Sequence, residues 1–348
     1  MTAEPLDHLR SLLCQLQVAV RTRLVAARNE RSTDDLASVA EITVADTIYQ
    51  IDKVSEEVIL QWFAANWPAD HPVELVMEGA EGGDAHTFPR GTAAAACEFV
   101  CILDPIDGTR NLMYDKRSAW MLAGLARRQP QGTRLGDIVV AAMTELPTTK
   151  QWASDQISGI RGCGPEGLVA ERFDIRSGQR EPLTLRPSQA SDFRHGFASI
   201  AKFFPEGKAT LARLEESLWE ALYGLGRSAS PVVFDDQYMT TGGQIYELMT
   251  GHDRMLGDLR PLVHARLGLE SALVCHPYDI CTCLLLEEAG GLVEDPFGRP
   301  LDAPLDTTSP VSWMGYANES LAAQVRPILQ RLIREQLAHD APTPERSS

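Results

Sequence analysis

The sequence predicts a two-part α/β protein, and three observations support that prediction. The chain has 348 residues, 44% of them apolar, which is enough for two domains or one large two-part unit. Apolar runs typical of buried strands recur beside amphipathic helical runs. Near residue 190 a region dominated by strands gives way to strands that alternate with helices. We expect an N-terminal α+β half over residues 1–189, a C-terminal α/β half over 190–338, and a disordered tail over 339–348.

Composition and charge exclude several classes of protein. The formal net charge is −16 at pH 7, which argues against a nucleic-acid partner or an anionic membrane surface. The seven cysteines are odd in number and lack metal-ligand spacing, so we expect free thiols in a reducing compartment. The N-terminus lacks the apolar core of a secretory signal, and no apolar run approaches the ~20 residues of a membrane span. We therefore expect a cytoplasmic protein that binds neither nucleic acid nor membrane.

Two amphipathic helices are predicted near the N-terminus. Apolar residues recur at three- and four-residue spacing over 6–30 and again over 44–67, where Pro68 ends the run. Asp46 falls near the start of the second helix, where a carboxylate complements the helix dipole. Packing and capping explain both helices without any functional role.

One short stretch places several candidate functional groups together. The apolar run 99–103 predicts a buried strand, and the turn Asp104–Thr109 (DPIDGT) follows it at once. Its two carboxylates, those of Asp104 and Asp107, would repel each other unless one takes up a proton or a cation lies between them. Oxygen ligands at a strand end, beside N–H groups of a turn that can bind an anion, suit Mg²⁺.

A purely structural interpretation of this turn stays open. Aspartates in Asp-Pro and Asp-Gly turns commonly cap their own backbone, and the turn chemistry by itself favours that interpretation. The glycine- and acid-rich loop 78–84, which follows a predicted strand over 73–77, is likewise typical of a solvated surface loop. The glycines at 242 and 243 are interpreted as a helix cap.

The segment Asp104–Thr109 resembles the signature of the inositol monophosphatase family. That family belongs to the lithium-sensitive, Mg²⁺-dependent sugar phosphatase group, together with fructose-1,6-bisphosphatase. Other segments resemble the family in the same order along residues 36–335. Asp46 ends a Thr-x-Ala-Asp segment, Glu78 follows a strand, and Asp279 opens an apolar helical run that ends in Glu-Ala-Gly-Gly at 288–291. Agreement of separate elements in order is more specific than any one of them.

The resemblance implies a fold and a metal site. The fold is a five-layer αβαβα sandwich with the active site between its two halves. The metal ligands are the carboxylates of Glu78, Asp104, Asp107 and Asp279 and the main-chain carbonyl of Ile106, which would hold two or three Mg²⁺ ions.

The resemblance also implies a reaction. Asp46 and Thr109 would position a metal-activated water for in-line attack on phosphorus. The phosphate would be bound by the main-chain N–H groups of Gly108 and Thr109 and by Arg110. The expected protein is a homodimeric phosphomonoesterase for a small phosphorylated metabolite, such as an inositol monophosphate or a sugar phosphate.

The chain departs from the family pattern at several positions, among them 79 and 110. Gly79 stands where the family has a second glutamate, so Glu78 and Glu81 are both candidates for the loop ligand. Arg110 stands where inositol monophosphatases have threonine, and in this it resembles the arginine that some relatives that hydrolyse histidinol phosphate have there. Histidinol phosphate, fructose 1,6-bisphosphate and nucleoside 3′,5′-bisphosphates therefore stay open as substrates. A non-catalytic binding relative is the alternative from another class, and only the unusual glutamate loop favours it.

Overall fold

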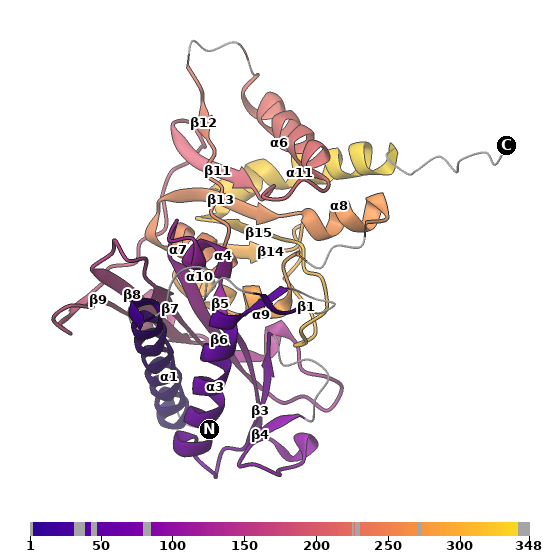
Figure 1. Cartoon of the computed structure of the whole chain (residues 1–348). Helices are drawn as coiled ribbons and strands as arrows, with labels where there is room; N and C mark the ends of the chain where they lie inside the picture. Colours follow the sequence, from indigo (N-terminus) through magenta and orange to yellow (C-terminus); the bar gives the residue numbers. More distant parts are fainter. Residues whose placement is uncertain are drawn as a thin grey trace.

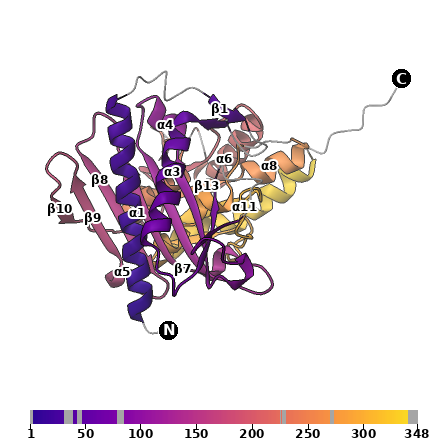
Figure 2. The same ribbon diagram turned by 60° about the horizontal axis from the view of Figure 1, so that its bottom comes forward.

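Five layers of helices and sheets make up the computed structural model, which describes residues 3–30, 39–42, 47–78, 85–224, 226, 230–269 and 273–339 (Figures 1 and 2). Helices α1 (Ala3–Glu30) and α3 (Gln50–Asn66) cover one face of an eight-stranded sheet. A middle layer of helices separates this sheet from a five-stranded sheet, whose far face is covered by a third set of helices. The predicted αβαβα sandwich is confirmed.

The eight-stranded sheet has the order β10-β9-β8-β7-β6-β5-β3-β4. Its neighbours are antiparallel except for β3 and β5, which are parallel. All nine residues of β5 are buried, as expected for a strand covered on both faces. The strand bounds are β3 Val73–Met77, β4 His86–Phe88, β5 Phe99–Asp107, β6 Ala119–Arg127, β7 Ile138–Leu146, β8 Ala153–Ile160, β9 Val169–Asp174 and β10 Arg180–Pro182.

The five-stranded sheet has the order β12-β11-β13-β15-β14. Strand β11 is parallel to β12 and β13, while β15 is antiparallel to β13 and β14. The chain leaves the larger sheet after Pro182 and enters the smaller one at Gly196, so residue 190 falls between the two sheets. The strand bounds are β11 Gly196–Ile200, β12 Val233–Phe234, β13 Asp253–Asp258, β14 Leu292–Glu294 and β15 Trp313–Tyr316.

The remaining helices fill the middle and outer layers. The middle layer contains α7 (Thr241–Thr250), α9 (Pro277–Ile280) and α10 (Cys283–Glu288). The outer layer contains α6 (Lys208–Tyr223), α8 (Arg260–Leu267) and α11 (Glu319–His339). Two short helices, α4 (Thr109–Met113) and α5 (Gly164–Gly167), lie in connections of the first half. Within the described residues, no helix is both long and apolar enough to cross a bilayer.

Three clusters of buried apolar residues hold the layers together. The apolar stripe of α1 packs with α3 on the larger sheet, and Leu9, Leu13 and Leu16 are fully buried there. This confirms the amphipathic helix predicted over 6–30. The second cluster lies between the sheets and joins β6, α7 and α10. The third packs α6, α8 and α11 on the smaller sheet. Since each helix layer buries an apolar face, the sheets are held at fixed separation.

Two predicted boundaries are wrong. The second helix begins at Gln50 and not at residue 44, because residues 47–49 form strand β2 and pair antiparallel with β1 (Val39–Ile42). β-Branched residues such as those at 47 and 48 suit a strand when a partner is available. Asp46 itself lies outside the described residues. The apolar helical run that Asp279 opens is divided into α9 and α10, with a break at residues 281–282. Of the tail expected over 339–348, His339 is the last residue of α11, and residues 340–348 lie outside the described residues.

Candidate active site

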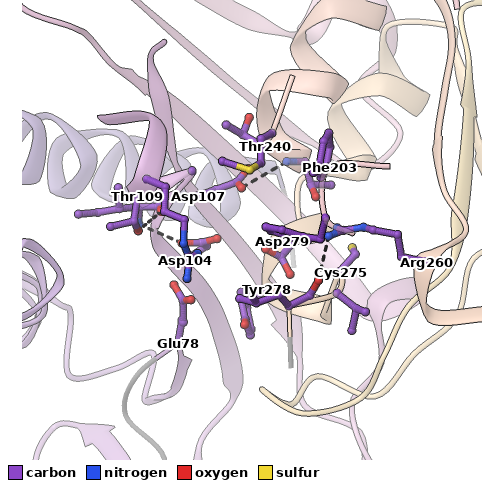
Figure 3. Close-up of a pocket in the computed structure, with 18 residues that line it drawn as sticks. Glu78, Asp104, Asp107, Thr109, Phe203, Thr240, Arg260, Cys275, Tyr278 and Asp279 are labelled. Carbon is purple, nitrogen blue, oxygen red and sulfur yellow. Dashed lines mark hydrogen bonds between the residues drawn. The ribbon is translucent and has the colours of Figure 1, made fainter. Parts of the chain in front are cut away.

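A pocket lies where the end of β5 meets the N-termini of α7 and α9 (Figure 3). It therefore lies between the two sheets, as the resemblance implied. Residues that line it come from both sides of the break at residue 190. They are Glu78, Asp104, Ile106, Asp107, Gly108, Thr109, Arg110, Phe203, Phe204, Met239, Thr240, Thr241, Arg260, Leu273, Val274, Cys275, Tyr278 and Asp279.

The first two carboxylates come from an irregular end of β5. Asp104 is paired with Leu122 of β6 and Asp107 with Trp120. The step between these pairs is three residues along β5 but two along β6, so β5 contains a bulge. Such a bulge re-aims side chains at a strand end. The carboxylate of Asp104 accepts a hydrogen bond from the N–H of Ile106 at 2.9 Å. The turn thus does cap its own backbone, as the structural interpretation proposed, and it also presents both carboxylates to the pocket.

The third carboxylate belongs to Asp279 in the first turn of α9. Its Oδ2 accepts a hydrogen bond from the N–H of His276 at 2.6 Å, so it caps the helix that carries it. One carboxylate oxygen from each of Asp104, Asp107 and Asp279 lies within 4.8 Å of the other two. Two distant segments of chain therefore build one acidic cluster, with Asp104 and Asp107 buried and Asp279 half-buried.

Glu78 completes the acidic side of the pocket. It directly follows β3, and its N–H donates to the carbonyl of Leu103 at 3.4 Å. This bond continues the pairing of β3 with β5 and fixes the backbone of Glu78 beside the signature turn. Its carboxylate points towards Asp104 (Figure 3).

Burial and mutual repulsion raise the pKa values of this cluster. Burial is the main cause for Asp104, whose pKa is raised well above its usual range, and the charges of Glu78, Asp107 and Asp279 add to the shift. Burial raises the pKa of Asp107 to about 7, against the opposing effect of the N–H groups of Gly242 and Thr241. Without a cation such a cluster holds protons near neutral pH, and a bound cation would take their place.

The N-terminus of α7 contacts Asp107 directly. The N–H groups of Thr241 and Gly242 donate to its two carboxylate oxygens at 3.2 and 2.5 Å. Thr240 caps the helix, because its hydroxyl accepts the N–H of Gly243 at 2.7 Å. The interpretation of the glycines at 242 and 243 as the helix cap is wrong, because the helix begins at Thr241 and both glycines lie in its first turn. The contact of this turn with the signature was missed. The run Thr-Thr-Gly-Gly before an apolar helix is the sequence signal for such a cap.

Gly108 allows the turn to approach α7 closely. Its φ of +94° lies in the left-handed region, and a Cβ there would lie 2.4 Å from Cγ2 of Thr240. The side chain of Asn111 adds a second link by donating to the carbonyl of Met239 at 3.2 Å. The signature turn and the α7 N-terminus are therefore fitted to each other by both shape and hydrogen bonds.

The structure brings most of the predicted site residues into one pocket. The hydroxyl of Thr109 donates to the carbonyl of Ile106 at 2.9 Å, and the half-buried Arg110 follows on the same turn. Asp46, Gly79 and Glu81 lie outside the described residues. Residues of the pocket that the sequence did not single out are Phe203, Phe204, Met239, Thr240, Thr241, Arg260, Leu273, Val274, Cys275 and Tyr278.

The fold and the site together define the class of protein: an αβαβα sandwich with a cluster of carboxylates between its two sheets. No protein-family model matches the chain, and no curated protein matches it by sequence. Solved structures match it over most of its length, and they show that the chain has the fold of the inositol monophosphatase and fructose-1,6-bisphosphatase superfamily.

Three of these structures represent the superfamily. The extragenic suppressor protein SuhB of Bartonella henselae is 16% identical, with a TM-score of 0.64 over 93% of this chain and 99% of that one. The fructose-1,6-bisphosphatase of Leishmania major is 15% identical, with a TM-score of 0.62 over 92% and 93%. Inositol monophosphatase II of Staphylococcus aureus is 17% identical, with a TM-score of 0.57 over 95% and 98%.

Proposed function

We propose that this protein is a Mg²⁺-dependent phosphomonoesterase that acts on a small phosphorylated metabolite. The observation that supports this most strongly is the cluster of Asp104, Asp107 and Asp279, whose ligand oxygens lie within 4.8 Å of one another in a pocket between the sheets. The shared fold with an inositol monophosphatase and a fructose-1,6-bisphosphatase supports the same class of reaction.

The chemistry of the donor set fits Mg²⁺. Every candidate ligand offers oxygen, which hard cations prefer. The pKa of Asp104 is raised mainly by burial and also by the charges of Glu78, Asp107 and Asp279, and a bound cation would offset that repulsion. The ligands would be the carboxylates of Glu78, Asp104, Asp107 and Asp279. The carbonyl of Ile106 would be a fifth ligand, since it keeps a lone pair beside its bond from Thr109. Two or three bound ions would neutralise the phosphate, lower the pKa of a water and stabilise the leaving oxygen.

Thr109 is suited to orient the attacking water. Its hydroxyl proton is engaged by the carbonyl of Ile106, so its oxygen faces other partners as an acceptor. An acceptor at this point would take a hydrogen bond from a water and aim the oxygen of that water towards phosphorus. By resemblance, Asp46 would be the second group that orients the water.

The phosphate would be bound by the turn that follows β5. The main-chain N–H groups of Gly108 and Thr109 lie at the start of α4, where N–H groups have no partner within the helix. Arg110 lines the same pocket and would neutralise part of the phosphate charge. An inositol monophosphate or a sugar phosphate is the expected type of ester, with histidinol phosphate, fructose 1,6-bisphosphate and nucleoside 3′,5′-bisphosphates as alternatives.

Release of phosphate from p-nitrophenyl phosphate and from a panel of phosphorylated metabolites tests the proposal. We expect turnover in Mg²⁺, its loss in excess chelator, and its return when Mg²⁺ is restored. Turnover that persists in excess chelator would contradict the metal-dependent reaction. Binding of Mg²⁺ without turnover of any ester would favour the non-catalytic relative instead. The homodimer is a further proposal, and a monomer mass by light scattering at micromolar concentration would contradict it.

A further inference from the structure

The pocket has a second wall that is largely apolar. We call it the distal wall, and it consists of Phe203, Phe204, Arg260, Leu273 and Val274. In Figure 3, Phe203 and Arg260 lie on the side of the pocket away from Glu78 and Asp104. Arg260 is the one residue of this wall that carries a charge. This wall lines the same pocket as the carboxylate cluster, so it lies within reach of the leaving group of an ester bound there.

The guanidinium of Arg260 is held in a fixed position. Its Nε and Nη2 donate to the carboxylate of Asp258 at 2.9 and 2.5 Å, and its Nη1 donates to the carbonyl of Leu273 at 2.8 Å. Its central carbon lies 4.9 Å from the ring centre of Phe203 and 5.4 Å from that of Phe204. Arg260 is only 7% exposed, and Asp258 only 1%. Little side-chain entropy is therefore left to lose when a ligand binds.

Arg260 keeps hydrogen-bonding capacity for a ligand. A guanidinium has five N–H groups, and the bonds to Asp258 and Leu273 use one each on Nε, Nη1 and Nη2. Within the described part of the chain, the second N–H of Nη1 and that of Nη2 have no acceptor. Two donors on a charged group suit a carboxylate or a phosphate better than a single neutral hydroxyl.

The other four residues of the distal wall select against neutral polyols. Each hydroxyl of a polyol would lose its water against Phe203, Phe204, Leu273 or Val274 without gaining a hydrogen bond from their side chains. An anionic group beside Arg260 would instead meet a charge of opposite sign next to aromatic rings, where the low dielectric strengthens attraction. Asp258 offsets the cost of burying the arginine, and its bonds together with that of Leu273 use three of the five N–H groups.

We propose that Arg260 determines substrate selectivity by binding a second anionic group, a carboxylate or a phosphate, on the leaving group of the ester. This inference rests on the proposed phosphatase function and makes it more specific. The substrate class is a phosphate ester with a second acidic group. Among the esters named under the proposed function, this favours the two bisphosphates over an inositol monophosphate.

Two matched pairs of esters test the proposal. 3-Phosphoglycerate and glycerol 3-phosphate differ by a carboxylate in place of a hydroxymethyl group. Propane-1,3-diol bisphosphate and 3-hydroxypropyl phosphate differ by a second phosphate. We expect the wild type to prefer the anionic member of at least one pair by about tenfold or more in kcat/KM. Arg260→Gln should remove that preference and Arg260→Lys should weaken it, because lysine keeps the charge without the planar fork.

Further variants separate selectivity from folding. Arg260→Gln leaves the buried carboxyl of Asp258 without its partner, so the double variant Asp258→Asn/Arg260→Gln removes both charges together. Arg331→Gln on α11 is the matched control, since Arg331 is half exposed and pairs only with Glu335 among described residues. The control should keep the wild-type ratio. Equal kcat/KM within both pairs for the wild type, or a preference that survives in both Gln variants, would overturn the proposal.

Binding distinguishes this proposal from the proposed function. If no ester of either pair is hydrolysed, these substrates do not support the phosphatase function. The affinities of the same esters, measured by calorimetric titration in Ca²⁺, then test the role of Arg260. Tighter binding of an anionic member that is lost in the double variant would support the role of Arg260. Equal binding of both members of each pair, or no binding of any ester, would overturn it.

Discussion

Asp107 and Gly242 are 135 positions apart in the chain, yet the N–H of Gly242 donates to the carboxylate of Asp107 at 2.5 Å. The bond joins the end of β5 to the N-terminus of α7, which packs between the two sheets. The same carboxylate belongs to the acidic cluster of the pocket. Asp107 thus links the position of a middle-layer helix to the geometry of the candidate metal site.

Replacing Asp107 by asparagine should abolish most activity without unfolding the protein. The amide has nearly the same size, but it lacks the negative charge of a Mg²⁺ ligand and offers one oxygen to two N–H donors. We expect a loss of at least about a hundredfold in kcat/KM. Asp70→Asn, in the exposed connection between α3 and β3, is the matched control and should keep full activity. Wild-type turnover by Asp107→Asn would mean that the signature is a structural turn.

Alanine at Gly108 should be more harmful than alanine at Gly132. Both glycines have a positive φ, +94° and +104°, so both variants carry backbone strain of about 1–2 kcal/mol. Only at position 108 would the new Cβ also meet Cγ2 of Thr240 at 2.4 Å, whereas Gly132 faces open space. Urea unfolding should show the larger loss of stability for Gly108→Ala, with activity reduced at least about tenfold. Equal losses in the two variants would indicate that the contact with α7 is unimportant.

The stability of the metal-free protein should fall as the pH rises from about 4 to about 7. Burial raises the pKa of Asp107 from its usual 3.8 to about 7, and it also raises that of Asp104. Between these limits the folded chain binds more protons than the unfolded chain, so the free energy of unfolding decreases with pH. Mg²⁺ competes with those protons, and its stabilising effect should therefore grow with pH.

Thermal unfolding with and without Mg²⁺ measures this effect. The increase in Tm caused by Mg²⁺ should be at least about 3 °C larger at pH 8 than at pH 5. In Asp107→Asn that difference should shrink. A Tm increase that is the same at both values of pH would show that the buried carboxyls do not exchange protons for the cation.

Glu78 should matter more than Glu81 for the metal. Glu78 is anchored by β3 and by its bond to Leu103, and Mg²⁺ demands near-ideal octahedral geometry. We expect Glu78→Gln to cost much more activity than Glu81→Gln and to raise the Mg²⁺ concentration needed for half-maximal rate. The missing glutamate at Gly79 should already raise that concentration in the wild type. If Glu81→Gln is the more damaging variant, the loop ligand is Glu81.

The parts of the site that the sequence predicted are those carried by continuous motifs. The strand before Asp104, the two signature carboxylates and the helix start at Asp279 depend on local patterns, and all three occur in the structure. The contact between Asp107 and α7 depends on packing across the middle layer, which leaves no local pattern. The same holds for Arg260, whose place in the pocket follows from the position of α8. Strand β2 was missed because it is a strand by virtue of its pairing with β1, and the spacing of apolar residues does not reveal that pairing.

Because the middle layer packs against both sheets, we expect that neither half of the chain folds without the other. Ile245 and Leu248 of α7 are buried in one cluster with Trp120 from the larger sheet and Leu256 from the smaller one. A fragment that stops near residue 190 would expose Trp120 and the apolar face around it to water, and its complement would expose α7. Each fragment should aggregate when it is refolded alone, and the native structure should form only when the two are refolded together. The break between the sheets is therefore a poor place to divide this protein into modules.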